Sequence, residues 1–165
     1  MSKTALIYGP IAGCIIIFGI IASIEFNVPY QWLGYLIMLI AFSAIYVAIQ
    51  RFRDEQQGGV ISFAKGFQVG LGVTVIASLI YVFGWELYLL LTDYAFVTDY
   101  TESVLEAERS SGMGAQEMAA LEADMEALRE QYSNILFRIA LSSVEIFPVG
   151  ILVSLISAAL NKTSK

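Results

Sequence analysis

The sequence contains no histidine and only one cysteine among its 165 residues. Histidine is the commonest metal ligand and the readiest general base near neutral pH, so its absence removes the usual parts of a metal centre or a hydrolytic site. The single Cys14 excludes an internal disulfide. Charged residues are also scarce, at 15% of the chain against about 25% in soluble domains. We therefore expect a non-enzymatic protein without metal, cofactor or nucleic-acid partner.

Long apolar runs account for much of the 58% of residues that are hydrophobic. Each is long enough to cross about 30 Å of hydrocarbon, which takes roughly 20 helical residues. The runs lack the period-two alternation of barrel strands, so helices are the spanning structure that they indicate. We predict an all-α polytopic membrane protein with a single four-span domain over residues 1–165. The predicted spans are about 6–24, 32–50, 67–91 and 135–160.

The distribution of Lys and Arg predicts how the spans are oriented. Cytoplasmic loops carry an excess of positive charge, and the two ends of the chain together with residues 51–66 hold six cationic side chains. The opposite side holds two, Arg109 and Arg129. This predicts a protein of the bacterial inner membrane with both termini in the cytoplasm. The six cations are Lys3, Arg51, Arg53, Lys65, Lys162 and Lys165.

The segment 51–66 is predicted to be a cytoplasmic loop at the membrane interface. Arg51, Arg53 and Lys65 are expected to contact anionic headgroups of the bilayer, at about 1 kcal/mol each. Gly58 and Gly59 permit a tight turn. The Gly-Lys-Ser/Thr ending of a phosphate-binding loop is absent, so nucleotide binding is not predicted.

Residues 93–134 are too charged to span and are predicted to form an extracytosolic helical hairpin with a break near 110–114. The net charge of −6 comes largely from the acidic residues of this segment. Apolar residues recur in the second helix at steps of 3 and 4, which gives one narrow seam. The seam either packs the two helices on each other or docks a partner or a second copy. Its members are Met118, Leu121, Met125, Leu128 and Tyr132.

Small residues one helical turn apart predict close helix packing. Gly9 with Gly13, and Gly66 with Gly70, form small-xxx-small pairs, which let backbones approach when no hydrophobic force drives helices together. These pairs serve either the four-helix bundle or a homo-oligomer.

Five polar side chains inside the apolar runs form the candidate site, because a charge in hydrocarbon is costly unless it is paired, protonated or wetted. In one interpretation Glu86 and Arg138 form a structural ion pair, and Glu145 is protonated or hydrogen-bonded across the bundle. In another, Glu145 and Glu86 line a proton-exchanging or ligand-binding cavity, and an enzymatic acid pair is a third. Pro148 frees a carbonyl beside Glu145 and predicts a kink. The predicted buried cluster is Gln68, Glu86, Arg138, Ser142 and Glu145.

A set of short motifs resembles a bacterial membrane family catalogued as domain of unknown function 4199. The resemblance covers nearly the whole chain and implies a four-span inner-membrane protein, while it brings no activity, cofactor or catalytic residue. Glu86 departs from the pattern, which favours compensation of Arg138 over a family mechanism. The motifs are Arg51-Phe-Arg53-Asp54-Glu55, Gly58-Gly59, Ile61-Ser62-Phe63, Lys65, Gly70, Tyr81, Trp85, Glu145-Ile-Phe-Pro148-Val-Gly150 and Leu155-Ile-Ser157-Ala158.

Two functions remain open from the sequence. The first is an accessory or assembly protein that acts through its helix bundle and its extracytosolic hairpin, with a membrane or periplasmic protein as partner. The alternative is a small oligomeric transporter or proton-coupled permeation unit that uses Glu145 and Glu86. The sequence identifies no small-molecule ligand for either.

Overall fold

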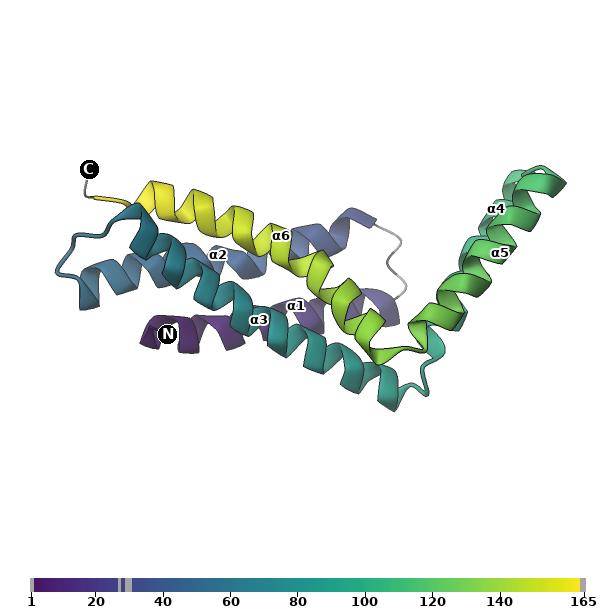
Figure 1. The fold of residues 1–165 in the computed structure, drawn as a ribbon, viewed down its shortest axis with the longest axis horizontal. Coiled ribbons are helices and arrows are strands. Elements are labelled where there is room, and N and C mark those ends of the chain that lie inside the picture. Colours follow the sequence, from purple (N-terminus) through teal and green to yellow (C-terminus); the bar gives the residue numbers. More distant parts are fainter. Residues whose placement is uncertain (1, 27, 29–30, 164–165) are drawn as a thin grey trace. The chain divides into compact units, whose positions relative to one another are not determined.

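The computed structural model describes residues 2–26, 28 and 31–163, and these residues form helices without strands. The all-α prediction is confirmed. Lys165, one of the cations counted above, lies outside the described residues. Six helices are labelled in Figure 1: α1 Lys3–Glu25, α2 Gln31–Gln56, α3 Phe63–Leu91, α4 Ala95–Ser111, α5 Ala115–Tyr132 and α6 Ile135–Asn161.

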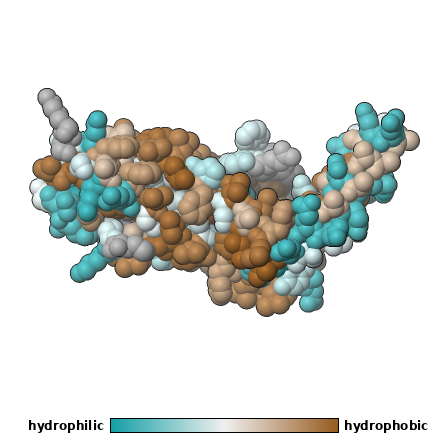
Figure 2. All heavy atoms as spheres, in the orientation of Figure 1, coloured by the Kyte–Doolittle hydropathy of each residue, from teal (hydrophilic) through white to brown (hydrophobic). Residues whose placement is uncertain are grey.

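Four of these helices, α1, α2, α3 and α6, are long and apolar enough to cross a membrane. Figure 2 shows apolar side chains along the middle of these four helices, whereas hydrophilic ones gather over α4 and α5 and at the end of the bundle where the chain ends. Many large apolar side chains on the four helices are exposed, including Phe18 at 70% and Phe83 at 72%. Exposed apolar surface on this scale is typical of a protein whose surroundings are lipid.

The predicted loop 51–66 is wrong in its extent. Arg51 and Arg53 lie in the last turns of α2, which runs to Gln56, and Lys65 lies in the first turn of α3. The sequence between them holds no helix breaker before Gly58, so the helix continues past the apolar run. The connection itself is 57–62.

Two glycines with positive φ end α2, as the sequence predicts. Gly58 has φ 62° and Gly59 has φ 88°, a region in which a Cβ is strained. The Gly59 N–H donates to the Arg53 carbonyl at 2.9 Å, which satisfies one of the last carbonyls of the helix. The connection is also held by the C-terminal tail, since the Ile61 N–H donates to Thr163 Oγ1 at 2.8 Å and the Thr163 N–H to the Ile61 carbonyl at 3.0 Å.

The chain divides into two compact units, residues 1–85 with 142–165 and residues 86–141. In the first unit, the predicted small residues lie where helices touch. A Cβ at Gly13 would lie 2.8 Å from the Ala77 carbonyl oxygen of α3, and one at Gly9 would lie 2.5 Å from the Cβ of Ile76. A Cβ at Gly66 of α3 would lie 3.3 Å from the Cβ of Ala158 of α6, and one at Gly70 would lie 2.8 Å from Ser154 Oγ. The glycines thus serve contacts within the bundle.

Buried hydroxyl groups join α3 and α6 in the same unit. Thr74 Oγ1 and Ser154 Oγ lie 3.2 Å apart, and both side chains are fully buried. One of these hydroxyls donates to the other, which in turn donates to a carbonyl of its own helix, that of Gly70 for Thr74 or that of Gly150 for Ser154. Such bonds hold helices together in lipid, where the alternative is an unsatisfied polar group. The helix α6 continues without a break through Pro148, whose side chain is exposed.

The second unit contains α4, α5 and the adjoining turns of α3 and α6. α4 and α5 pack against each other and are joined through Gly112, which has φ 82°. The predicted break at 110–114 coincides with this connection. The seam residues of α5 are half-buried, except for Tyr132, which is buried and contacts Phe96 of α4 with ring centroids 6.2 Å apart. The seam is therefore occupied by packing between α4 and α5.

Candidate functional site

Arg138 and Glu86 form a bidentate ion pair in the second unit. Arg138 Nε donates to Glu86 Oε1 at 2.8 Å, and Nη2 donates to Oε2 at 2.7 Å. The Arg138 side chain is 4% exposed and that of Glu86 19%. Two parallel charge-assisted bonds are the strongest arrangement available to these groups. The pairing expected from the sequence is present.

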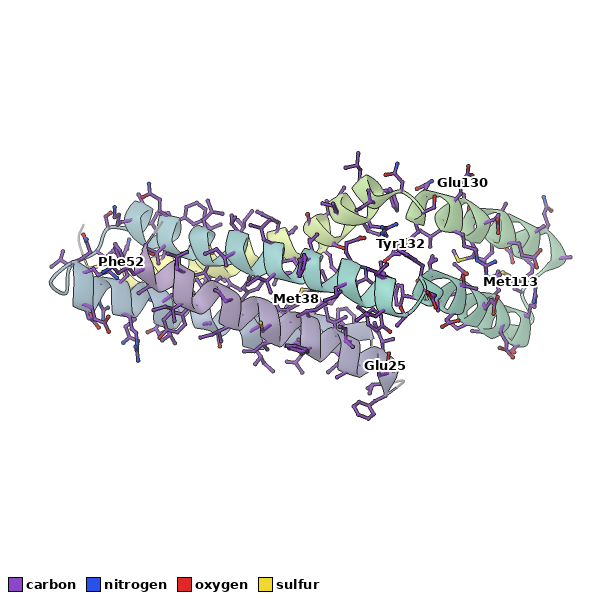
Figure 3. All side chains as sticks on the ribbon, turned by 90° about the horizontal axis from the view of Figure 1, so that it is seen from below. Glu25, Met38, Phe52, Met113, Glu130 and Tyr132 are labelled. Atoms are coloured by element: carbon purple, nitrogen blue, oxygen red, sulfur yellow. The ribbon has the colours of Figure 1, made fainter. Side chains whose placement is uncertain are left out.

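The remaining donors of Arg138 are used by the backbone. Nη1 donates to the carbonyls of Tyr132 at 2.7 Å and Ser133 at 3.1 Å, at the junction between α5 and α6. Figure 3 labels Tyr132 at this end of α5. The guanidinium also lies 5.2 Å from the centroid of the Tyr94 ring. Arg138 therefore ties the last turn of α3, the start of α4 and the end of α5 to α6.

The turn between α3 and α4 is strained in a way that fits this role. Asp93 and Tyr94 have φ of 51° and 58°, which is unusual for residues other than glycine and costs of order 1 kcal/mol each. The Tyr94 N–H donates to the Leu89 carbonyl at 2.8 Å, which closes the turn. The contact between the Tyr94 ring and Arg138 offsets part of that cost, since a cation over an aromatic face is worth about 0.5–2 kcal/mol.

Glu145 lies in the first unit and does not belong to a buried cluster. Its side chain is exposed on the outer surface of α6, and its carboxylate accepts one hydrogen bond, from the Tyr81 hydroxyl of α3 at 3.2 Å. Tyr81 itself is 3% exposed and stacks on Trp85 with centroids 6.4 Å apart. The hydrogen bond across the bundle that one interpretation expected for Glu145 is therefore present, from Tyr81. The expected burial of Glu145 is not, because residue spacing gives the direction of a side chain on α6 but not which neighbours pack beside it.

The two other members of the predicted cluster also separate. Ser142 is buried at 6% exposure. Gln68 is exposed and lies 13 residues before Tyr81 on α3, about 20 Å along the helix axis. It lines a hollow near the 57–62 connection and takes no part in the surroundings of Glu145.

Tyr81 appears among the family motifs, but its hydrogen bond to Glu145 was not predicted from the sequence. A phenol in an apolar run carries one polar atom that needs a partner, and Tyr81 with Trp85 recurs at a spacing of four, on one helix face. That pattern was sufficient to place an interhelical hydrogen bond on this side of α3. The Tyr94 ring, by contrast, is brought to Arg138 by a turn whose backbone conformation no propensity predicts.

The cationic side chains of the 51–65 region have individual partners. The Arg51 guanidinium lies 6.0 Å from the Tyr8 ring centroid, and Arg53 Nε donates to Asp54 Oδ1 at 2.7 Å. Lys65 Nζ lies 6.0 Å from the centroid of the Phe52 ring. Among the described residues, no group of three or more His, Cys, Asp or Glu side chains is placed to hold a metal ion.

The comparisons with known proteins give a family and no activity. No curated protein matches the chain, and no solved structure matches it. A family model does match, over residues 3–163. Since this range is nearly the whole sequence, the chain belongs to the family described as Protein of unknown function (DUF4199).

Proposed function

We propose that this protein is a non-enzymatic scaffold of the bacterial inner membrane that presents an acidic helical hairpin on the extracytosolic side. The four long helices are the membrane domain, and α4 with α5 is the hairpin. Both termini and the 57–62 connection lie in the cytoplasm, which the excess of Lys and Arg at those segments supports. The protein acts by holding a membrane or periplasmic protein partner and uses no cofactor.

The observation that carries this proposal is the set of contacts around Arg138. One buried side chain binds the end of α3, the turn before α4 and the end of α5, and it uses an ion pair, two carbonyls and an aromatic ring to do so. A flexible connection between two spans needs no such anchor. A helical pair whose base is fixed gives a binding surface that loses little conformational freedom when a partner binds.

The exposed face of the hairpin indicates the chemistry of the partner. Residues 93–134 contain ten acidic residues and two arginines. Arg109 pairs with Glu122, and Arg129 lies 3.8 Å from Glu126 and donates to Thr101 Oγ1. Most of the negative charge of the hairpin is therefore uncompensated. Glu130 of α5 points away from α4 in Figure 3. A basic surface on the partner is complementary to it.

Charge reversal on the hairpin tests this proposal in the full-length protein. Glu126→Lys with Glu130→Lys changes one face of α5 and leaves the seam intact. Proteins that are cross-linked to the wild type in intact membranes should no longer be cross-linked to this variant. They should still be cross-linked to Glu55→Lys, a charge reversal in the last turn of α2 and outside the hairpin. An unchanged set of cross-linked proteins would contradict the proposal, provided that the variants unfold at the wild-type temperature.

Glu145 favours a second candidate, the oligomeric permeation unit. An exposed carboxyl on a membrane-spanning helix needs water, a partner or a proton. Glu86 is held by Arg138, which leaves Glu145 as the group that exchanges protons. Proton flux into liposomes should then depend on Glu145, with loss in Glu145→Gln and retention in Glu145→Asp. Equal flux in all three proteins and in empty liposomes would exclude it.

A further inference from the structure

A hollow of about 500 Å³ lies where the N-terminus of α1, the end of α2 and the start of α3 meet. This volume is within the range of about 300–1,000 Å³ found for small-ligand sites. Phe52, labelled in Figure 3, forms part of the wall near the end of α2. The lining residues are Ser2, Phe52, Gln56, Lys65, Gln68 and Val69.

Lys65 gives the hollow its charge. Its neighbour Arg53 is neutralised by Asp54, and Arg51 lies over the Tyr8 ring. Within the described part of the chain no carboxylate forms an ion pair with Lys65, whose ammonium contacts only the Phe52 ring, 6.0 Å away. The hollow therefore contains a cation whose charge is available to a ligand.

The other polar groups around Lys65 suit an anion that accepts several hydrogen bonds. The amides of Gln56 and Gln68 each supply N–H donors, and both side chains line the hollow. Two helices begin beside it, α1 after Ser2 and α3 at Phe63, and the positive ends of helix dipoles favour negative charge. The cation and the dipoles favour an anion, and the amides can donate hydrogen bonds to it.

Phe52 and Val69 give the hollow apolar walls at the end of the membrane-spanning helices. An inorganic anion gains nothing from such walls, whereas a phosphate ester with a carbon skeleton places its anion by Lys65 and its carbons against Phe52 and Val69. Basic pockets between spanning helices on the cytoplasmic side are a known way to bind phospholipid headgroups.

We propose that this hollow binds a phosphate ester, with the phosphate held by Lys65, Gln56 and Gln68. The ester comes either from an anionic phospholipid of the adjacent leaflet or from a soluble phosphate ester. Binding of a phospholipid from the cytoplasmic leaflet depends on the orientation of the chain given under the proposed function. Binding of a phosphate group by Lys65, Gln56 and Gln68 does not depend on that orientation. The site is independent of the extracytosolic hairpin.

Native mass spectrometry of the full-length protein from nanodiscs tests the proposal. Nanodiscs of phosphatidylcholine with phosphatidylglycerol should yield protein that retains phosphatidylglycerol. Lys65→Gln should weaken retention about fivefold or more, since one Lys near the surface is worth about 1 kcal/mol. Lys65→Arg should retain the lipid. Lys162→Gln should behave as the wild type, because it removes a charge at the same end of the helix bundle, beside the 57–62 connection, but outside the hollow.

The outcomes distinguish a phospholipid ligand, a soluble phosphate ester and an effect of surface charge alone. Retention that glycerol 3-phosphate does not displace assigns the site to lipid. Displacement by glycerol 3-phosphate, or binding of glycerol 3-phosphate without lipid, assigns it to a soluble ester. Equal losses in Lys65→Gln and Lys162→Gln would overturn the proposal, since they would show only surface charge, as would equal retention of phosphatidylglycerol and phosphatidylcholine. A thermal unfolding temperature equal to that of the wild type, measured in pure phosphatidylcholine, establishes that Lys65→Gln is folded.

Discussion

Arg138→Gln removes the anchor of the second unit and leaves the Glu86 carboxylate inside it without a counter-charge. Breaking a buried pair on one side typically costs about 3–5 kcal/mol. The substitution also frees the Tyr132 and Ser133 carbonyls that Nη1 satisfies, and each unsatisfied carbonyl adds about 1–3 kcal/mol where water does not replace the bond. We expect a loss of at least 4 kcal/mol in the free energy of unfolding.

Glu86→Gln should be milder. The amide oxygen still accepts one bond from Arg138, and the guanidinium keeps its two carbonyls and the Tyr94 ring. We expect a loss of about 2–3 kcal/mol, at or below the lower limit for a broken buried pair, because Glu86 is 19% exposed and water reaches part of the site. The double variant should be at least as stable as Arg138→Gln alone, because it no longer contains the uncompensated carboxylate.

The double-mutant cycle of Glu86 and Arg138 is measured by reversible unfolding in detergent, which is monitored by hydrogen exchange of the backbone amides in α4 and α5. The coupling energy should be about 2–3 kcal/mol, at the upper end of values for residues in contact. Arg109 and Glu122 supply the control, since this pair is 60% and 47% exposed and should couple by less than about 1 kcal/mol. Additive effects of the Glu86 and Arg138 substitutions would refute the anchor.

Three further predictions concern single positions. Gly13→Ala should destabilise the bundle by about 1–3 kcal/mol, because the added Cβ would meet the Ala77 carbonyl oxygen. Gly34→Ala should be neutral or stabilising by up to about 1 kcal/mol, because its Cβ would meet nothing within 4 Å. Thermal unfolding compares the two variants. Gly59→Ala should cost about 1–2 kcal/mol at φ 88° and raise proteolysis of the 57–62 connection. Glu145→Gln should change the free energy of unfolding by less than about 1 kcal/mol, because it loses a single hydrogen bond on an exposed face, and a large loss in the same assay would place Glu145 in the interior.

The four helices long enough to cross a membrane could be predicted because that property requires only length and apolarity, both of which are read directly from a sequence. The ion pair between Glu86 and Arg138 could also be predicted from the sequence, for a related reason. Two opposite charges at similar distances from the ends of their helices have no better partner in lipid than each other.

The rest of the site depends on packing that spacing does not determine. Arg138 and Glu145 point in nearly the same direction on α6, seven residues apart, yet one is buried and the other exposed. α2 ends later than the predicted span, at Gln56, and α3 begins earlier, at Phe63, because the apolar runs are shorter than the helices. Arg51, Arg53 and Lys65 therefore lie on helices, and Lys65 faces a hollow that no single segment of sequence reveals.

The side of the membrane on which α4 and α5 lie tests the central claim most directly. Single cysteines introduced by Glu130→Cys and Gln57→Cys, in a Cys14→Ser background, are exposed to a membrane-impermeant maleimide in spheroplasts. The proposed function predicts labelling at position 130 in intact spheroplasts and at position 57 only after lysis. Labelling at position 57 with protection at position 130 would contradict it, and the hairpin could then not meet an extracytosolic partner.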